Sequence, residues 1–337
     1  MADYRLIIIG GGLSGLAAGI RSARFGQKTL IVEQHSLPGG LNSYYYRKGY
    51  LLETGLHAMT NFAAQGNKHA PLNRLFRQLK LSRKKFITHE QSGSEVIFPY
   101  ASLRFSNNFN LLCEEIACHF PARIDRFRAM AAEIDAYDPF AELPWQSARD
   151  FLHNRLADSL LEDMLLLPLM VYGNAEEHDM DLGQFAIMFR AVFLEGFFRP
   201  QGTIKDLIDM LLEQYSKFGG EVRFRAPVAE IINKDDKVQG IRLQNGEEIS
   251  ADAVLSTVGI PGTAQLSSWP LDIEQYTGQM TFMETISMIP ELHLPPERAG
   301  RTILFYSLNE KLRYLQPDDA IDPSWGVICF PENCQGL

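Results

Sequence analysis

Residues 5–33, RLIIIGGGLSGLAAGIRSARFGQKTLIVE, constrain the fold of this chain more than any other segment. They contain a short β-branched apolar run, the glycine pattern G-x-G-x-x-G, a helical apolar pattern, and a second apolar run that ends in an acid. The glycines of the pattern are Gly10, Gly12 and Gly15. This order of features is typical of a β-α-β unit that binds a dinucleotide.

Each glycine has a mechanical role in such a unit. Gly10 permits the tight turn, Gly12 lets the backbone approach a pyrophosphate, and Gly15 lets the helix and strand pack closely. The helix that follows points free N–H groups and the positive end of its dipole at the phosphates. The predicted phosphate site also includes Gly11, and Ser14 as a hydroxyl donor.

The second apolar run ends at Glu33, about twenty residues after the glycines, where a dinucleotide ribose needs an acceptor for its hydroxyl groups. An acid at this place argues against a ribose that carries a 2′-phosphate. The glycine pattern alone also fits an accidental glycine turn. The glycine pattern is, however, followed by a helix, a second strand and a terminal acid in the order of a dinucleotide-binding unit. This order favours a nucleotide site over an accidental turn.

Residues 37–55, LPGGLNSYYYRKGYLLETG, indicate which dinucleotide is bound. Here the chain resembles the FAD-dependent amine oxidase and phytoene desaturase superfamily, most closely its phytoene desaturase, carotenoid isomerase and retinol saturase-like branch. In that superfamily a Gly-Gly pair follows the ribose acid, and an acid-x-Gly closes the next strand. Gly39, Gly40, Glu53 and Gly55 match this template. The resemblance therefore implies that the cofactor is FAD.

Two positions depart from that template. Many family members have Arg after the glycine pair, where this chain has Leu41, and many have Asp where it has Glu53. The first change removes a candidate phosphate cation. Either Arg47 or Lys48 takes its place, or the helix dipole is sufficient. Leu41 remains among the residues that the resemblance places at the cofactor.

A second match covers residues 197–259 and resembles the central block of the family. The pattern predicts a helix over 203–217, which Gly219 and Gly220 end. The resemblance implies that the backbone of Val228 meets the adenine, although a plain strand residue is the alternative. Strands are predicted at 221–225, 228–233, 238–243 and 253–258, the last of which returns to the nucleotide-binding sheet.

The fold class implied by the resemblance is α/β, with a Rossmann-type FAD-binding domain interleaved with an α+β substrate domain of mixed sheet and helices. The expected FAD-binding parts are residues 1–66 and 199–262, and the expected substrate parts are the helical 67–198 and the strands of 263–337. A glycine-rich C-terminal flavin segment of the family has no counterpart before Leu337. We therefore expect the chain to hold FAD weakly and to turn over slowly.

The middle region is predicted to be mostly helical, with strand character at 95–105. The expected helices cover 110–119, start at Pro121 and at Ser147, and cover 181–198. The apolar residues 164–173 are too short to span a bilayer and are expected in the core. The aromatic residues of 181–198 fit core packing best, with the lining of a lipid-substrate tunnel and contact with a membrane surface as alternatives.

Composition excludes several classes of protein. A net charge of −9 without a basic block argues against nucleic acid as a partner. The four cysteines form C-x4-C pairs, which is not a metal spacing, so we expect no metal and reduced thiols. No secretory signal opens the chain, and we expect it in the cytoplasm, with peripheral membrane contact as an option.

These features favour an FAD-dependent oxidoreductase that acts on a hydrophobic polyene or isoprenoid-like small molecule by hydride transfer. An amine or amino-acid oxidase, and a non-enzymatic lipid-binding relative similar to Rab GDP-dissociation inhibitors, are the alternatives. No catalytic residue is predicted. His57 follows Gly55 closely enough to approach the flavin ring, but a structural histidine is the simpler interpretation. A flavin carries the difficult chemistry itself, so the lack of a dyad does not argue against an enzyme.

Overall fold

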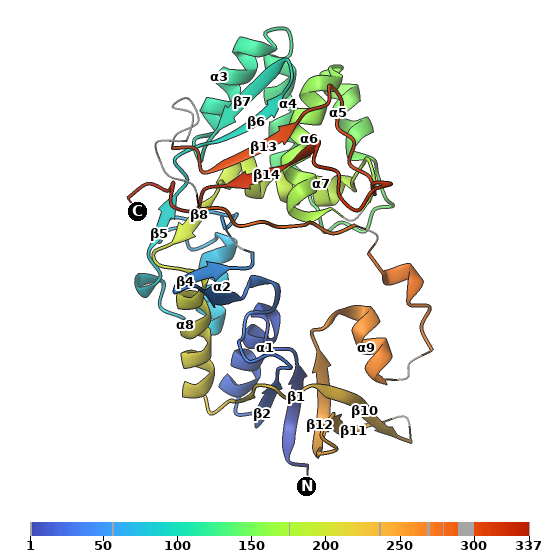
Figure 1. Cartoon of the computed structure of the whole chain (residues 1–337). Helices are drawn as coiled ribbons and strands as arrows, with labels where there is room; N and C mark the ends of the chain where they lie inside the picture. Colours follow the sequence, from blue (N-terminus) through green and yellow to red (C-terminus); the bar gives the residue numbers. More distant parts are fainter. Residues whose placement is uncertain are drawn as a thin grey trace. The chain divides into compact units, whose positions relative to one another are not determined.

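A computed structural model describes residues 2–55, 57–174, 176–235, 237–267, 270–278, 280–288 and 300–336 (Figure 1). The chain forms two compact units. Unit 1 comprises Met1–Leu56, Gln65–Ile87 and Pro200–Thr277, and unit 2 comprises His57–Ala64, Thr88–Arg199 and Gly278–Leu337. Both units are therefore assembled from segments that are far apart in the sequence.

Unit 1 is built on a six-stranded sheet in the order β10-β11-β12-β1-β2-β9. The strands β12, β1, β2 and β9 run parallel, whereas β10, β11 and β12 form an antiparallel meander. The central strands β1 and β2 are largely buried, as is typical of parallel strands that are covered on both faces, whereas β9 and β12 carry several exposed residues. The strands are β1 (Tyr4–Ile9), β2 (Thr29–Val32), β9 (Glu221–Arg223), β10 (Val228–Lys234), β11 (Lys237–Leu243) and β12 (Glu248–Ser256).

Strand β12 connects the two parts of this sheet. Its first residues pair with β11, and Ala251–Ser256 then pair in parallel with β1. The predicted return to the nucleotide-binding sheet is thus confirmed. The predicted end at Val258 is wrong, because β1 ends at Ile9 opposite Ser256 and the chain turns there into α9.

Helices α1 and α8 pack together against the sheet of unit 1. A Cβ on Gly19 of α1 would lie 2.8 Å from Ile31 Cδ1 and 2.9 Å from Tyr215 Cε2, so the absence of a side chain allows this close packing. The hydroxyl of Tyr215 donates to the carbonyl of Thr29 at 2.8 Å, and burial raises the pKa of this phenol. The helical segments are α1 (Leu13–Arg24), η1 (Gly40–Asn42), α2 (Pro71–Leu79), η2 (Arg83–Lys85), α8 (Ile204–Lys217), α9 (Gly259–Ser267) and η4 (Glu274–Tyr276).

Residues 65–87 lie in unit 1, whereas the sequence analysis placed 67 onward in the substrate domain. The reason is a set of contacts with α1 and with the segment that precedes α8. Arg24 of α1 donates to the carbonyl of Gln78 at 3.0 Å, and the Gln201 amide donates to the carbonyl of Ile87 at 2.9 Å. Unit 1 also extends to Thr277 instead of ending at 262. The family resemblance did not predict these contacts between segments that are distant in the sequence.

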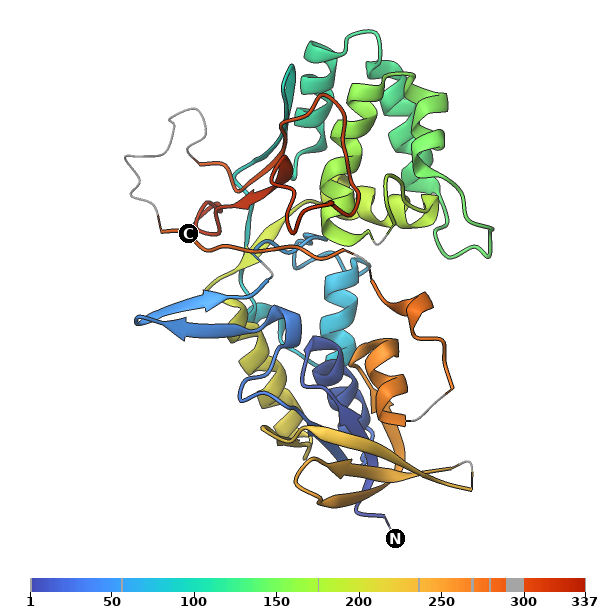
Figure 2. The same ribbon diagram turned by 45° about the vertical axis from the view of Figure 1, so that its right-hand side comes forward.

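A two-stranded hairpin of β3 (Tyr44–Arg47) and β4 (Tyr50–Glu53) follows the Gly39–Gly40 turn. Figure 2 shows this hairpin, in blue, projecting from the rest of unit 1. Tyr44 pairs with Glu53 at its base, and Arg47 pairs with Tyr50 at its tip. The hairpin therefore carries Arg47 away from the turn from which it starts.

Unit 2 contains a four-stranded mixed sheet in the order β14-β13-β6-β7, together with helices. The strands β6 and β13 are parallel, and the outer pairs are antiparallel. This agrees with the expected α+β architecture. The elements are β5 (Thr88–Glu90), β6 (Ser94–Phe98), β7 (Ala101–Phe105), α3 (Phe109–His119), α4 (Ile124–Ala136), α5 (Ala148–Leu156), α6 (Ser159–Gly173), α7 (Leu182–Phe189), the π-helix η3 (Arg190–Glu195), β8 (Phe198–Pro200), β13 (Ile303–Ser307) and β14 (Trp325–Cys329).

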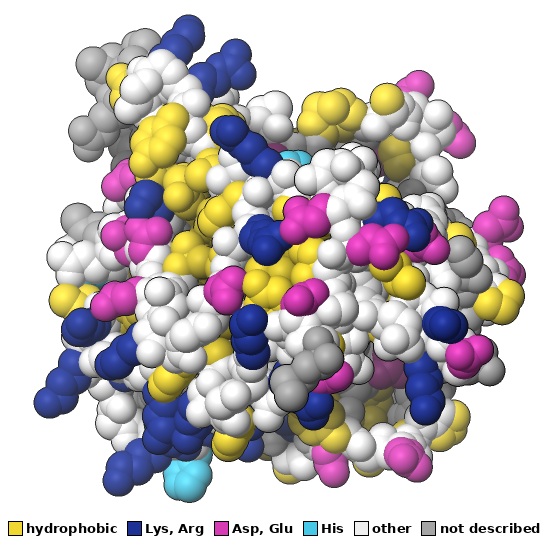
Figure 3. All heavy atoms as spheres, turned by 90° about the horizontal axis from the view of Figure 1, so that it is seen from below, with side chains coloured by type: hydrophobic (Ala, Val, Ile, Leu, Met, Phe, Trp, Pro, Cys, Tyr) yellow, Lys and Arg dark blue, Asp and Glu magenta, His cyan; other side chains and the backbone are white. Residues whose placement is uncertain are grey.

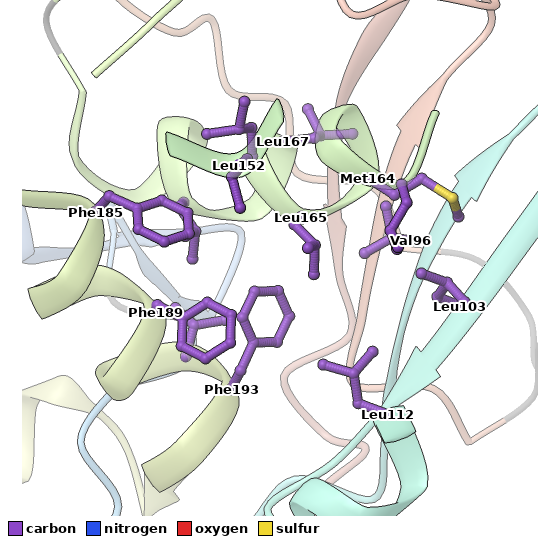
Figure 4. Close-up of a cluster of buried hydrophobic side chains, with 14 of the residues drawn as sticks. Val96, Leu103, Leu112, Leu152, Met164, Leu165, Leu167, Phe185, Phe189 and Phe193 are labelled. Carbon is purple, nitrogen blue, oxygen red and sulfur yellow. The ribbon is translucent and has the colours of Figure 1, made fainter. Parts of the chain in front are cut away.

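The core of unit 2 is formed by the apolar faces of these helices and the sheet (Figure 4). Phe185, Phe189 and Phe193 lie fully buried in it, with ring centroids 5.7 Å and 5.2 Å apart along the series. The core interpretation of this aromatic helix is thus confirmed, and contact of these rings with a membrane surface is wrong. The apolar residues 164–170 lie in the same core, as expected.

Two predicted helix boundaries in unit 2 are wrong. The segment expected as one helix over 181–198 is α7 followed by the π-helix, and it ends before Gly196, which has φ of +89°. A Cβ on Gly196 would lie 2.0 Å from Asn107 Oδ1, so the chain turns closely around that side chain. The helix expected at Pro121 begins at Ile124. Ser147 does cap α5, since its side chain accepts from the Asp150 amide.

Within the described ranges, no helix is long and apolar enough to cross a membrane, and no cluster of potential metal ligands occurs. The cysteines Cys113, Cys118, Cys329 and Cys334 are all free thiols. Burial raises the pKa of the Cys329 thiol to about 12. This thiol is therefore protonated and unreactive at neutral pH.

Candidate nucleotide-binding site

The turn after β1 has the geometry that its glycines predict. Gly10 has φ of +106°, a conformation that side chains disfavour. A Cβ on Gly15 would lie 2.0 Å from the Gly10 carbonyl oxygen, which is closer than real atoms approach. Gly15 thus allows α1 to start directly against the end of β1. The turn and the helix form one compact backbone unit.

The first turn of α1 is left open for an external anion. Its N-cap is Gly12, which has no side chain to accept from the first amides, and no acidic residue lies in the first turn. The amides of a first helical turn have no partner within the helix, and the positive end of the helix dipole lies at the same place. This is the arrangement that holds phosphate groups at helix N-termini. The residues present fit a pyrophosphate.

The Gly39–Gly40 turn packs directly on this glycine loop. The Gly39 amide donates to the Gly11 carbonyl at 2.9 Å, and a Cβ on Gly40 would lie 3.3 Å from Gly12 Cα. Both residues have positive φ, +111° for Gly39 and +61° for Gly40. Two sequence motifs that are separated by a helix and a strand are thus brought together.

Glu33 lies immediately after β2 and is 6 % exposed. Its Oε2 accepts from the Gly11 amide at 2.6 Å, and its Oε1 accepts from the His35 amide at 2.9 Å. These two bonds fix the carboxylate beside the glycine loop. Each oxygen keeps a further lone pair, because an ionised carboxylate has about four acceptor sites. Glu33 can therefore accept hydrogen bonds from the paired hydroxyls of a ribose.

A cavity of about 600 Å³ lies between the segment after β9 and the turn after β11. It is lined by residues that include Phe224, Arg225 and Pro227. The Glu33 amide donates to the Arg223 carbonyl, and its carbonyl accepts from the Ala226 amide, both at 2.9 Å. Val228 follows this lining directly in the chain. The cavity thus lies beside residues whose backbone is hydrogen-bonded to Glu33, and the sequence analysis did not single out Phe224 or Arg225.

A second cavity has a volume of about 410 Å³. Ser14 of α1 and Thr257 at the end of β12 both line it. The Thr257 hydroxyl donates to the Ile9 carbonyl at 3.0 Å, and a Cβ on Gly10 would lie 2.5 Å from it. This second cavity lies at the carboxyl end of β1, whose neighbours in the sheet are β2 and β12. Ligands of open α/β sheets bind at such a switch point.

Leu41, Glu53 and Gly55 lie in the loop and hairpin after the glycine pair. Leu41 is 90 % exposed, and its side chain supplies no cation. A Cβ on Gly55 would lie 2.7 Å from the Leu41 carbonyl oxygen, so Gly55 is needed for close packing of this loop. Arg47 and Lys48 are exposed at the hairpin tip. The sequence analysis considered two replacements for the family's Arg: a cation from Arg47 or Lys48, or the dipole of the first helix. The geometry favours the dipole at the first turn of α1.

Glu53 has a structural partner that sequence reasoning missed. Its Oε1 accepts from the Ile204 amide at 2.6 Å, at the first residue of α8. The carboxylate is buried and serves the N-terminus of that helix together with the capping box of Thr203 and Asp206. An acid is favourable at a helix N-terminus, which explains the residue type without a ligand.

Replacing Glu53 by Ala should lower the free energy of unfolding by about 1–3 kcal/mol, because a buried amide of α8 loses its charged acceptor. Glu213→Ala, at an exposed position of the same helix, is the matched control and should change little. Urea unfolding followed by circular dichroism measures both. Equal stability of the two variants would show that Glu53 does not support α8.

His57 belongs to unit 2, and its contacts are those of a structural residue. Its Nε2 lies 2.6 Å from Glu284 Oε1, and its carbonyl accepts from Arg199 Nη1 at 3.1 Å. These bonds connect segments 57–64, 280–288 and β8 within that unit. They account for a polar side chain at this position without a role at the flavin.

Comparison with known proteins identifies the family. The pattern of the family described as flavin containing amine oxidoreductase matches residues 13–296. The chain belongs to this family. Its members are flavoproteins.

Individual relatives within the flavin-containing amine oxidoreductases are distant. A chloroplastic prolycopene isomerase of Daucus carota is 22% identical over 285 residues, covering 75% of this chain and 46% of that protein. A lycopene-forming phytoene desaturase of Pseudescherichia vulneris is 23% identical over 292 residues, covering 77% and 56%. The chain thus spans about half the length of these relatives. The crystal structure of an oxidoreductase from Methanosarcina mazei shares the fold, with a TM-score of 0.63, 20% identity, and coverage of 80% of this chain and 62% of that one.

Proposed function

We propose that the chain binds FAD through its ADP half in unit 1. The observation that carries this proposal is the convergence of three features at the end of β1: the open first turn of α1, the buried Glu33 carboxylate and the Gly39–Gly40 turn. They match a pyrophosphate and a ribose without a 2′-phosphate. Proposed contact residues are Gly10, Gly11, Gly12, Ser14, Gly15, Glu33, Gly39, Gly40, Leu41, Gly55 and Val228.

The activity that we propose is oxidation, reduction or isomerisation of a hydrophobic polyene or isoprenoid-like substrate. Bound FAD supplies hydride transfer to and from carbon, so the protein has to bind, orient and shield the reactants. The support is the similarity to a prolycopene isomerase and a phytoene desaturase across three quarters of the chain. The proposal concerns the activity of a whole protein, whereas the chain spans about half the length of these relatives.

Replacing Glu33 by Ala should weaken FAD binding by about 1–3 kcal/mol, because the ribose hydroxyls lose a charged acceptor. An equilibrium titration that follows quenching of flavin fluorescence measures the affinity. Glu213→Ala serves as control, since this exposed glutamate of α8 lies away from the glycine loop. If the Glu33 variant retains FAD as tightly as the unmodified chain, the ribose assignment is wrong.

The substrate class is tested by anaerobic mixing of the FAD-loaded chain with a polyene in detergent micelles, and separately with primary amines and amino acids. We expect the polyene to change its absorption spectrum in a flavin-dependent manner, and the amines to leave the flavin oxidised. Bleaching of the flavin by amines alone would instead support an amine or amino-acid oxidase. Binding of the polyene without any spectral change of polyene or flavin would support a lipid-binding relative.

A further inference from the structure

Residues 54–89 have an unusual charge composition. They contain seven Lys and Arg residues and neither Asp nor Glu, in a chain whose net charge is −9. The longest run of consecutive cations is only three residues, from Arg83 to Lys85, so the sequence does not show this feature as a basic block. The excess of positive charge becomes evident in the structure, because most of these cations lie on or beside α2 and η2.

Helix α2 presents its cations to solvent because its apolar side chains hold it to unit 1. Phe76 and Leu79 are buried, whereas Arg74 and Arg77 lie on the exposed side. Pro71 begins the helix, and Lys80 ends it in a left-handed conformation. The following η2 turn is held by the Phe76–Phe86 ring contact, with centroids 4.9 Å apart.

The exposed face also carries aliphatic side chains. Leu75 is 45 % exposed and Ile87 is 48 % exposed, and both lie among the cations in the sequence. Among the described residues, no acidic side chain forms an ion pair with Arg74, Lys84 or Lys85. Figure 3 shows Lys and Arg side chains gathered at the lower left of one face of the molecule, with few acidic ones beside them.

We propose that this face docks on the surface of an anionic lipid bilayer. The face, called the basic surface below, consists of Lys68, Arg74, Leu75, Arg77, Lys80, Lys84, Lys85 and Ile87. Each cation near a negatively charged leaflet contributes about 1 kcal/mol of attraction, and exposed aliphatic side chains insert at the headgroup boundary. The aliphatic neighbours favour a membrane over nucleic acid, because single strands are bound mainly by aromatic stacking and base edges.

Docking through this face brings unit 1 to a membrane by charge and shallow insertion, without a membrane-spanning helix. The inference goes beyond the proposed oxidoreductase function and does not depend on it, because it concerns a surface separate from the glycine loop. It also differs from the membrane contact considered for the aromatic helix of unit 2, whose rings are buried.

The test is co-sedimentation of the full chain with vesicles of phosphatidylcholine mixed with phosphatidylserine, and with vesicles of phosphatidylcholine alone. The variant Arg74→Glu, Lys84→Glu, Lys85→Glu reverses three exposed cations of the basic surface. The variant Lys234→Glu, Lys237→Glu, Lys311→Glu makes the same change of net charge at exposed positions elsewhere and is the control. Thermal unfolding of all three proteins shows that each is folded.

We expect the unmodified chain and the control to bind the mixed vesicles at low salt and to be released by high salt. The variant of the basic surface should bind at least about 100-fold more weakly, given the loss of three attractive charges. Equal binding by both variants, or equal binding to phosphatidylcholine alone, would overturn the proposal. The proposal would also be overturned if the chain bound no vesicles but bound single-stranded DNA, and if the variant of the basic surface lost that DNA binding. This result would assign the basic surface to nucleic acid.

Discussion

Phe189→Asp and Phe193→Asp are each expected to unfold unit 2. Both rings are fully buried and contact each other in the core, with centroids 5.2 Å apart. Removing a buried phenylalanine side chain costs about 3–5 kcal/mol, and an unpaired carboxylate in its place adds the cost of burying a charge. The total exceeds about 5 kcal/mol, which is comparable to the whole stability of many domains.

The control for these variants is Phe140→Asp, because Phe140 is 84 % exposed in the same unit. It should express and unfold like the unmodified chain. The measurement is urea unfolding followed by near-ultraviolet circular dichroism. If Phe189→Asp and Phe193→Asp remain folded, keep FAD and lose only binding of a carotenoid or retinoid, then these rings line a substrate tunnel and the core interpretation is wrong.

Gly15→Ala should abolish measurable FAD binding, with a loss of at least about 100-fold in affinity. The added Cβ would lie 2.0 Å from the Gly10 carbonyl oxygen, so the helix has to shift away from the turn that presents its amides. Overpacking of this kind costs about 1–3 kcal/mol in stability, and it displaces the anion site at the same time.

Gly66→Ala is the matched control for this variant, because a Cβ at Gly66 meets nothing within 4 Å. It should leave both stability and FAD affinity unchanged. Fluorescence titration with FAD and thermal unfolding measure the two quantities. Retention of normal FAD affinity by Gly15→Ala would place the cofactor away from the start of α1.

The local features of the nucleotide site could be predicted because they depend on short sequence separations. The turn at Gly10, the helix that starts after Gly12, and Glu33 at the tip of β2 all follow from one continuous segment. The spacing of glycines and apolar residues determines them by backbone sterics and burial alone. The family resemblance placed Gly39 and Gly40 at the cofactor, but the packing of Gly39 on Gly11 was not predicted.

Other features depend on contacts that no local pattern shows. Glu53 accepts from Ile204, 151 residues later, so its role at α8 becomes visible only in the folded chain. The placement of 65–87 in unit 1 rests on contacts with α1 and with Gln201. The end of the aromatic helix at Gly196 depends on the side chain of Asn107. Each of these is set by tertiary packing that overrides the local sequence pattern.

The central claim is that the chain holds FAD by its ADP half, and a competition titration tests it most directly. FAD is bound to the full chain, and ADP or FMN is then added while flavin fluorescence and anisotropy are followed. The open first turn of α1 and Glu33 predict that ADP displaces FAD, whereas FMN, which lacks the ADP half, does not. Displacement by FMN without displacement by ADP, or no binding of FAD at all, would contradict the account.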